Sequence, residues 1–147
     1  MSKKVMVLVG TSKGGFIFSS DANRKHWQTS DIHFKSWNVM HIQMDPRDQR
    51  LHAATSHFVY GPTTHYSDDF GNTWTQAKQV PLLTRSSKSG RPASTVDEAF
   101  RSEGGESIAD KPEKMIKVWN IKPGRVDEPN VLYAGAQPAS FFVSKDR

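Results

Sequence analysis

The segment "HYSDDFGNTW", residues 65–74, places turn-forming and strand-forming residues in the fixed pattern S-x-D-x-G-x-T-W. The members of the pattern are Ser67, Asp69, Gly71, Thr73 and Trp74. Serine and aspartate oxygens accept backbone N–H groups that a strand ladder leaves open, and glycine tolerates a positive φ. The tryptophan starts the next strand with a large apolar side chain to bury. The pattern therefore predicts a structural turn between two antiparallel strands.

Three segments of the chain repeat one pattern around this turn. Residues 7–21, 51–69 and 132–146 each read as a strand ending in small residues, a loop, and a second strand running into Ser and Asp. Aligning Gly10, Ala54 and Gly135 gives two similar spacings once residues 81–113, rich in Ser, Gly, Arg and Glu, are set aside. Repeats of roughly 40–50 residues with four strands each are typical of propeller blades.

A further strand precedes two of these segments. "WNVMHIQMDPRD" (residues 37–48) and "VWNIKPGRVDEP" (residues 118–129) both run from a tryptophan through apolar alternation to a Pro-containing turn, which places Trp37 and Trp119 at matching strand positions. The complete repeat has predicted strands at residues 37–44, 51–55, 63–67 and 73–77. Only residues 94–103 carry a helix signal.

The fold class expected from these repeats is all-β. We predict one domain over residues 1–147, an incomplete β-propeller of about three antiparallel four-stranded blades joined by turns of the S-x-D-x-G-x-T-W type. Residues 1–33 form blade one without its first strand, 34–80 blade two, 81–113 a flexible insert and 114–147 a truncated blade three. A ring normally takes more blades, so we expect the natural chain to be longer and the isolated one to self-associate.

These motifs resemble a known family. The S-x-D-x-G-x-T-W turn is similar to the Asp box of sialidase-type blades, and "VGTSKGGFIFSSDANRKHW" and "VLYAGAQPASFFVSKD" resemble bacterial exo-alpha-sialidase or BNR-repeat glycosyl hydrolases and photosystem II stability and assembly factors. The resemblance implies a β-propeller and a glycosyl hydrolase name that rests largely on fold. Sialidases also carry an F-R-I-P motif, which this chain lacks.

Composition narrows the remaining possibilities. The formal charge is +5, but the basic residues are spread among acidic ones, so charge does not favour a nucleic-acid partner. The chain has no cysteine, and residues 65–74 lack the spacing of a calcium loop, so we expect no metal and no cofactor. The apolar run at the N-terminus is short and breaks at Gly10. We therefore expect a cytoplasmic protein with no membrane partner.

Connections in an antiparallel blade alternate between two ends, which locates a candidate site. The loop end opposite the Asp box holds Thr11, Ser12, Lys13, Phe34, Lys35, Ser36, His57, Tyr60 and Gln137, with Trp37 and His41 near the axis. Cations suit a carboxylate, aromatic faces suit a sugar ring, and His or Tyr can transfer protons. The candidate ligand-binding residues are Lys13, Lys35, Trp37 and Gln137, and the candidate catalytic residues are His57, Tyr60 and His41. Each also has an ordinary explanation as strand packing or a solvated loop charge.

Two functions are favoured by the sequence, and a third, a nucleic-acid binder, is suggested only by charge and would need basic residues focused on one face. One is a sialidase-like glycosyl hydrolase-type propeller that acts on or binds a carbohydrate or small anionic ligand at the axis. The alternative is a non-catalytic scaffold or assembly factor that binds a protein partner. The acidic residues expected near the loop end all belong to the insert or its border, which weakens the first function for this chain alone.

Overall fold

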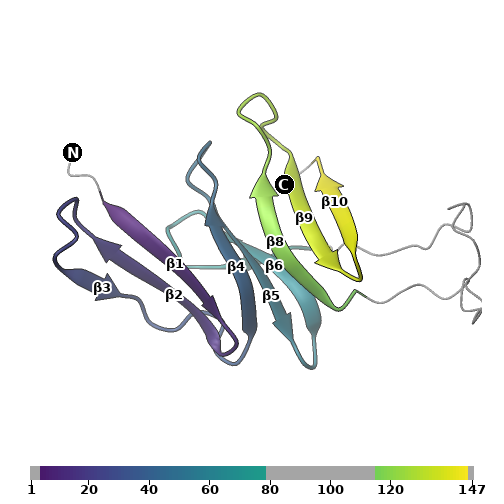
Figure 1. Cartoon of the computed structure of the whole chain (residues 1–147), viewed down its shortest axis with the longest axis horizontal. Coiled ribbons are helices and arrows are strands. Elements are labelled where there is room, and N and C mark those ends of the chain that lie inside the picture. Colours follow the sequence, from purple (N-terminus) through teal and green to yellow (C-terminus); the bar gives the residue numbers. More distant parts are fainter. Residues whose placement is uncertain (1–3, 79–114, 146–147) are drawn as a thin grey trace, which may run out of the picture. The chain divides into compact units, whose positions relative to one another are not determined.

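Ten β-strands in three antiparallel sheets make up the part of the chain that the structure describes (Figure 1). The structure is a computed structural model, and it describes residues 4–78 and 115–145, all within one compact unit. The strands are β1 (Val5–Thr11), β2 (Gly14–Ser20), β3 (Trp27–Thr29), β4 (Asn38–Met44), β5 (Leu51–His57), β6 (Gly61–Ser67), β7 (Thr75–Gln76), β8 (Lys117–Pro123), β9 (Leu132–Gln137) and β10 (Ser140–Ser144). No helix occurs in these two ranges, so the all-β prediction is confirmed for them.

Each sheet is a meander whose strands follow the order of the chain. The orders are β1-β2-β3, β4-β5-β6-β7 and β8-β9-β10. The predicted flexible insert and the helix signal at residues 94–103 lie outside the described residues. β4 starts one residue later than predicted because the Trp37 N–H donates to the Phe34 carbonyl in a turn. β7 is shorter than predicted because the Thr73 N–H donates to Asp69, at 2.9 Å, and not to β6.

The middle sheet is covered on both faces. On one face, Val39, Ile42 and Ala53 form a buried cluster with Leu8 of β1 packed against it. On the other, Ala54 joins buried residues of the third sheet, among them Val118 and Ile121, in a second cluster. The burial pattern of β5 follows from this, because five consecutive residues from Leu51 are buried on a strand whose side chains alternate between faces. Figure 1 shows the β4–β7 sheet between the other two.

Small residues allow the sheets and strands to approach closely. A Cβ at Gly10 would overlap the backbone oxygen of Val39, so β1 requires glycine where it passes β4. At Gly135 a Cβ would lie 2.8 Å from Oδ1 of Asn120, the residue opposite it on β8. Ala54 holds the same register position opposite His41 of β4. Gly10 is therefore required by a neighbouring sheet and Gly135 by the facing strand of its own sheet, while Ala54 shares the register position of Gly135.

The expected equivalence of Trp37 and Trp119 is wrong. The first strands of the second and third sheets each carry a β-bulge. It lies between Val39 and His41 in β4 and between Val118 and Asn120 in β8. Counting from the bulges, Trp119 corresponds to Met40, while Trp37 lies before its strand begins. A bulge adds one residue to one strand of a pair. The tryptophans therefore have different environments, and Trp119 is exposed with Lys117 over its ring at 5.1 Å.

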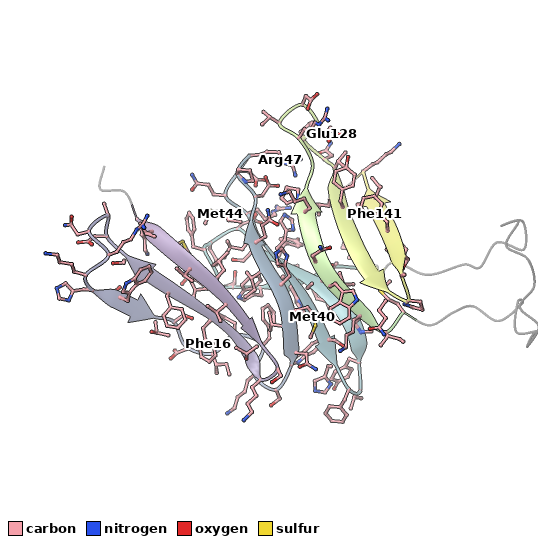
Figure 2. All side chains as sticks on the ribbon, in the orientation of Figure 1. Phe16, Met40, Met44, Arg47, Glu128 and Phe141 are labelled. Atoms are coloured by element: carbon pink, nitrogen blue, oxygen red, sulfur yellow. The ribbon has the colours of Figure 1, made fainter. Side chains whose placement is uncertain are left out.

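A buried arginine joins the second and third sheets at the end that carries the S-x-D-x-G-x-T-W turn. We call this turn, residues 67–74, the Asp-box turn, and its end of the sheets the Asp-box end. The guanidinium of Arg47, in the β4–β5 turn, donates to both carboxylate oxygens of Asp45, and the closest contact is 2.7 Å. It also donates to the backbone carbonyls of Glu128 and Val131 in the β8–β9 turn. Figure 2 shows Arg47 and Glu128 in these neighbouring turns. Nothing in the repeat pattern of the sequence predicted this contact.

Candidate functional site

The Asp-box turn is held by its own side chains. The Ser67 hydroxyl accepts the N–H of Gly71 at 2.8 Å and donates to Asp69 at 2.8 Å. The Asp69 carboxylate accepts the Thr73 N–H at 2.9 Å and the Thr73 hydroxyl at 2.7 Å. These bonds from Thr73, then that from Ser67, hold the pKa of Asp69 below its usual value. Gly71 has a φ of +94°. The side-chain oxygens of Ser67, Asp69 and Thr73 are thus bonded inside the turn, as expected for a structural motif.

The opposite end of the sheets carries a different set of loops, which we call the rim. It consists of residues 11–14, 33–37, 57–61 and 137–140. Three of these segments are hairpin loops, closed by the strand pairs Thr11–Gly14, His57–Gly61 and Ala136–Ser140. The Ser36 N–H donates to the Lys13 carbonyl at 3.0 Å, which ties the first sheet's turn to the start of the second sheet. The structure therefore brings Lys13 and Lys35, two predicted ligand-binding residues, into connected segments.

The backbone around Lys35 is strained. Phe34 has a φ of +53° and Ser36 a φ of +71°, values that residues with a Cβ rarely adopt. The Phe34 ring packs against Trp74 and His65, with 4.8 Å between centroids in both cases. The N–H of Ser36 donates to the Lys13 carbonyl, and that of Trp37 donates to the Phe34 carbonyl. Such conformations persist only when the surroundings impose them, and they concentrate at functional sites.

Three predicted site residues form one aromatic group at the rim. The Trp37 and Tyr60 rings are stacked, with centroids 6.0 Å apart and an interplanar angle of 15°. His57 lies beside both, with its ring centroid 4.9 Å from that of Trp37 and 5.0 Å from that of Tyr60. Its Nδ1 accepts the Val59 N–H at 3.2 Å, which leaves the other ring nitrogen without a role in this turn. We call Trp37, His57 and Tyr60 the aromatic platform.

A buried histidine lies beneath the platform. His65 on β6 has its ring 5.7 Å from Trp37 and its Nδ1 3.2 Å from the hydroxyl of Thr55. Burial lowers the pKa of His65, because the charged imidazolium loses hydration there. The ring is therefore a neutral packing partner at pH 7 and gives the platform a rigid base.

Within the described residues, the rim carries lysines, whereas carboxylates and arginines occur together at the Asp-box end. At the rim lie Lys13, Lys35 and Lys117, the last of these pairing with Gln137 at the ends of β8 and β9. All carboxylates of the two described ranges except Asp31 lie in turns at the Asp-box end: Asp21, Asp45, Asp48, Asp68, Asp69, Asp127 and Glu128. Two of them are paired with Arg47 and Arg50. The rim therefore has a positive field that suits an anion.

Two of the predicted site residues, His41 and Gln137, take part in hydrogen bonds to backbone N–H groups and not in the aromatic platform. His41 lies within β4, where its Nδ1 accepts the Ile121 N–H of β8 at 3.3 Å, so the ring bridges two sheets. Burial, and then the charge of Lys122, lowers the pKa of His41. Gln137 lies at the end of β9, and its carbonyl accepts the Ile116 N–H at 2.8 Å. The contacts of these residues do not connect them with the aromatic platform.

Sequence reasoning missed two residues at the tip of the β5–β6 hairpin. Phe58 is 92% exposed and Val59 is 63% exposed, next to Tyr60 at 75%. The available signal was the run "FVY" directly before Gly61 and Pro62, because hairpin tips are normally built from polar residues and glycine. Lys117 was also missed, because the strand segment read from the sequence began at Val118, one residue after it.

Comparisons with protein-family models and with curated proteins found no match to this chain. The described residues contain no group of three His, Asp or Glu side chains that could hold a metal ion. No helix in residues 4–78 or 115–145 is long and apolar enough to cross a membrane. Function must therefore be argued from the rim.

Proposed function

We propose that the three sheets are successive blades of an Asp-box β-propeller of the sialidase-like type. Three features support this arrangement: each sheet is an antiparallel meander, the middle sheet is covered face to face by the other two, and the complete sheet carries an Asp-box turn between its third and fourth strands. The bulges shared by β4 and β8, and the small residues Ala54 and Gly135 on the partner strands β5 and β9, add a repeated register.

Within that fold, we propose that the rim binds a carbohydrate that carries a carboxylate. The observation that carries this proposal is the stacked Trp37–Tyr60 pair. Lys35 lies two residues before Trp37, within the strained backbone of residues 34–36. Aromatic faces suit the apolar side of a sugar ring, while the rim lysines neutralise its acid group. Lys13 joins the same surface through its carbonyl bond to Ser36.

Binding is a better assignment than hydrolysis for the described residues. Glycosidases normally use two acidic groups on either side of the scissile bond. The four rim segments contain no carboxylate, and Asp31, two residues before one of them, is the nearest in sequence within the two described ranges. His57 and Tyr60 could exchange protons with a ligand, but they have no carboxylate partner among their contacts. We therefore expect affinity for sugar acids without turnover of a sialic-acid reporter by this chain.

Titration with N-acetylneuraminate, followed by NMR chemical shifts, tests the proposal, with N-acetylglucosamine as the neutral control. Tyr60→Ala should weaken binding by about twofold to tenfold, the range expected for one aromatic contact. The matched control is Phe141→Ala, which removes another exposed ring. That ring stacks on Tyr133, with centroids 5.6 Å apart, and is not part of the aromatic platform. Equal affinity for both sugars, or equal losses in both variants, would refute the proposed site.

A further inference from the structure

The tip of the β5–β6 hairpin is built from side chains that water does not favour. Phe58, Val59 and Tyr60 lie beyond the last strand pair, His57–Gly61, and are exposed by 92%, 63% and 75%. The Phe58 ring contacts the ring of His57, at 4.5 Å, and points its surface to solvent. Three consecutive exposed apolar residues form a convex apolar tip, which fits a soft or concave apolar partner.

The charges around this tip restrict the partner further. Lys13 and Lys35 lie in the rim segments next to the platform, whereas the described carboxylates other than Asp31 lie at the far end of the sheets. An apolar tip at the end that carries Lys13 and Lys35, away from most of the described carboxylates, is the arrangement that an anionic surface attracts. The amphipathic ring of Tyr60, within the tip, stacks on that of Trp37, and an interfacial layer favours such rings.

We propose that the hairpin tip of residues 58–60 inserts into the interface of an anionic lipid bilayer, with Lys13 and Lys35 on its headgroups. The sequence led us to expect no membrane partner because no segment can span a bilayer, but a tip that lies in the interface needs no span. Phe58 and Val59 supply apolar burial, and the lysines supply attraction that depends on negative lipids. This inference stands on the tip and the charge pattern, and it does not rest on sugar binding.

Sedimentation with vesicles tests the proposal on the full chain. The vesicles are phosphatidylcholine alone, or phosphatidylcholine with about a third phosphatidylserine to give an anionic surface. We expect binding to the anionic vesicles, weakened by salt and by Lys13→Ala with Lys35→Ala. The double variant Phe58→Ser/Val59→Ser should lower the partition coefficient at least about tenfold. Both side chains are mostly exposed, so the fold should not depend on them.

Val126→Ser provides the matched control. Val126 is 86% exposed in the β8–β9 turn at the Asp-box end, so its replacement removes a comparable apolar group from the wrong end. We expect unchanged vesicle binding for this variant and unchanged N-acetylneuraminate affinity for the tip variant. A chain that stays in the supernatant with both vesicle types overturns the proposal and leaves the tip as a protein contact. The proposal is also overturned if the tip variant and Val126→Ser lower the partition coefficient equally, or if the chain binds both vesicle types equally.

Discussion

Removal of Arg47 is expected to destabilise the protein more than any other single surface-turn substitution in the described residues. The Arg47 side chain is only 7% exposed, and that of its partner Asp45 is 0% exposed. The same guanidinium also binds two carbonyls of the β8–β9 turn. Arg47→Ala therefore removes the guanidinium from a buried carboxylate, which still has the Arg47 N–H and lies 3.9 Å from Nε2 of His52, and it frees two backbone acceptors between sheets.

The size of the effect follows from burial. Breaking a buried ion pair by removing one partner costs about 3–5 kcal/mol, because the remaining charge stays away from water. Arg50 offers a matched control a few residues away, with an ion pair to Asp68 at 2.6 Å but with side-chain exposures of 23% and 61%. Exposed pairs contribute about 0–1 kcal/mol. Arg47→Lys should fall between the two, since an ammonium keeps the charge but loses the flat fork that reaches Asp45 and both carbonyls.

Urea unfolding followed by tryptophan fluorescence measures these differences. We expect the midpoint to fall strongly for Arg47→Ala, to fall partly for Arg47→Lys and to change little for Arg50→Ala, at similar slopes. A loss for Arg47→Ala no larger than that for Arg50→Ala would refute the reasoning. It would mean that the contact between the two turns does not contribute to holding the sheets together.

Three further changes test the interior and the turn. Ser67→Ala should lower the free energy of unfolding by about 1–3 kcal/mol, because the buried Gly71 N–H loses its acceptor. The urea midpoint measures this loss. Thr73→Ser is the control and should have little effect, because serine keeps the hydroxyl that bonds to Asp69. Gly71→Val should destabilise at least as much, by melting temperature, because φ is +94° and a Cβ would overlap Ile17. For His65 the folded pKa lies below the ordinary 6.5, so the unfolded chain takes up more protons in acid. The contribution of His65 to the free energy of unfolding should therefore be fully present above about pH 6.5 and should decline as the pH falls towards the folded pKa. The decline should be smaller in His65→Asn. A urea midpoint that does not change across this pH range would contradict the assignment.

Local patterns were sufficient to predict the strands and the turn. Alternation, small residues and turn chemistry act within a few residues, so the positions of β4, β5 and β6 and the bonds of Ser67 and Asp69 follow from the sequence alone. The β-bulge could not be predicted in this way. An extra residue is selected by packing against another sheet, and it shifts the correspondence of Trp119 from Trp37 to Met40.

Long-range contacts also determined what the sequence could say of the site. Strand connectivity was enough to assign Lys13, Lys35, Trp37, His57 and Tyr60 to one end, because connections alternate between the two ends of a meander. It could not show which of them touch. The stacking of Trp37 on Tyr60 depends on the left-handed turn at residues 34–36, and the sequence of that turn contains no glycine to signal it.

Stability and binding should be separable, because the two ends of the sheets treat their polar groups differently. At the Asp-box end, Asp69 is bonded within its turn, and Arg47 is bonded across to the next sheet. At the rim, the aromatic platform rests on His65 and makes no contact with that network. Arg47→Lys should therefore shift the urea midpoint while leaving N-acetylneuraminate affinity unchanged at low temperature, and Tyr60→Ala should do the reverse. If Arg47→Lys weakened sugar binding while the chain remained folded, the rim would depend on the alignment of the second and third sheets, and the platform alone would not be the site.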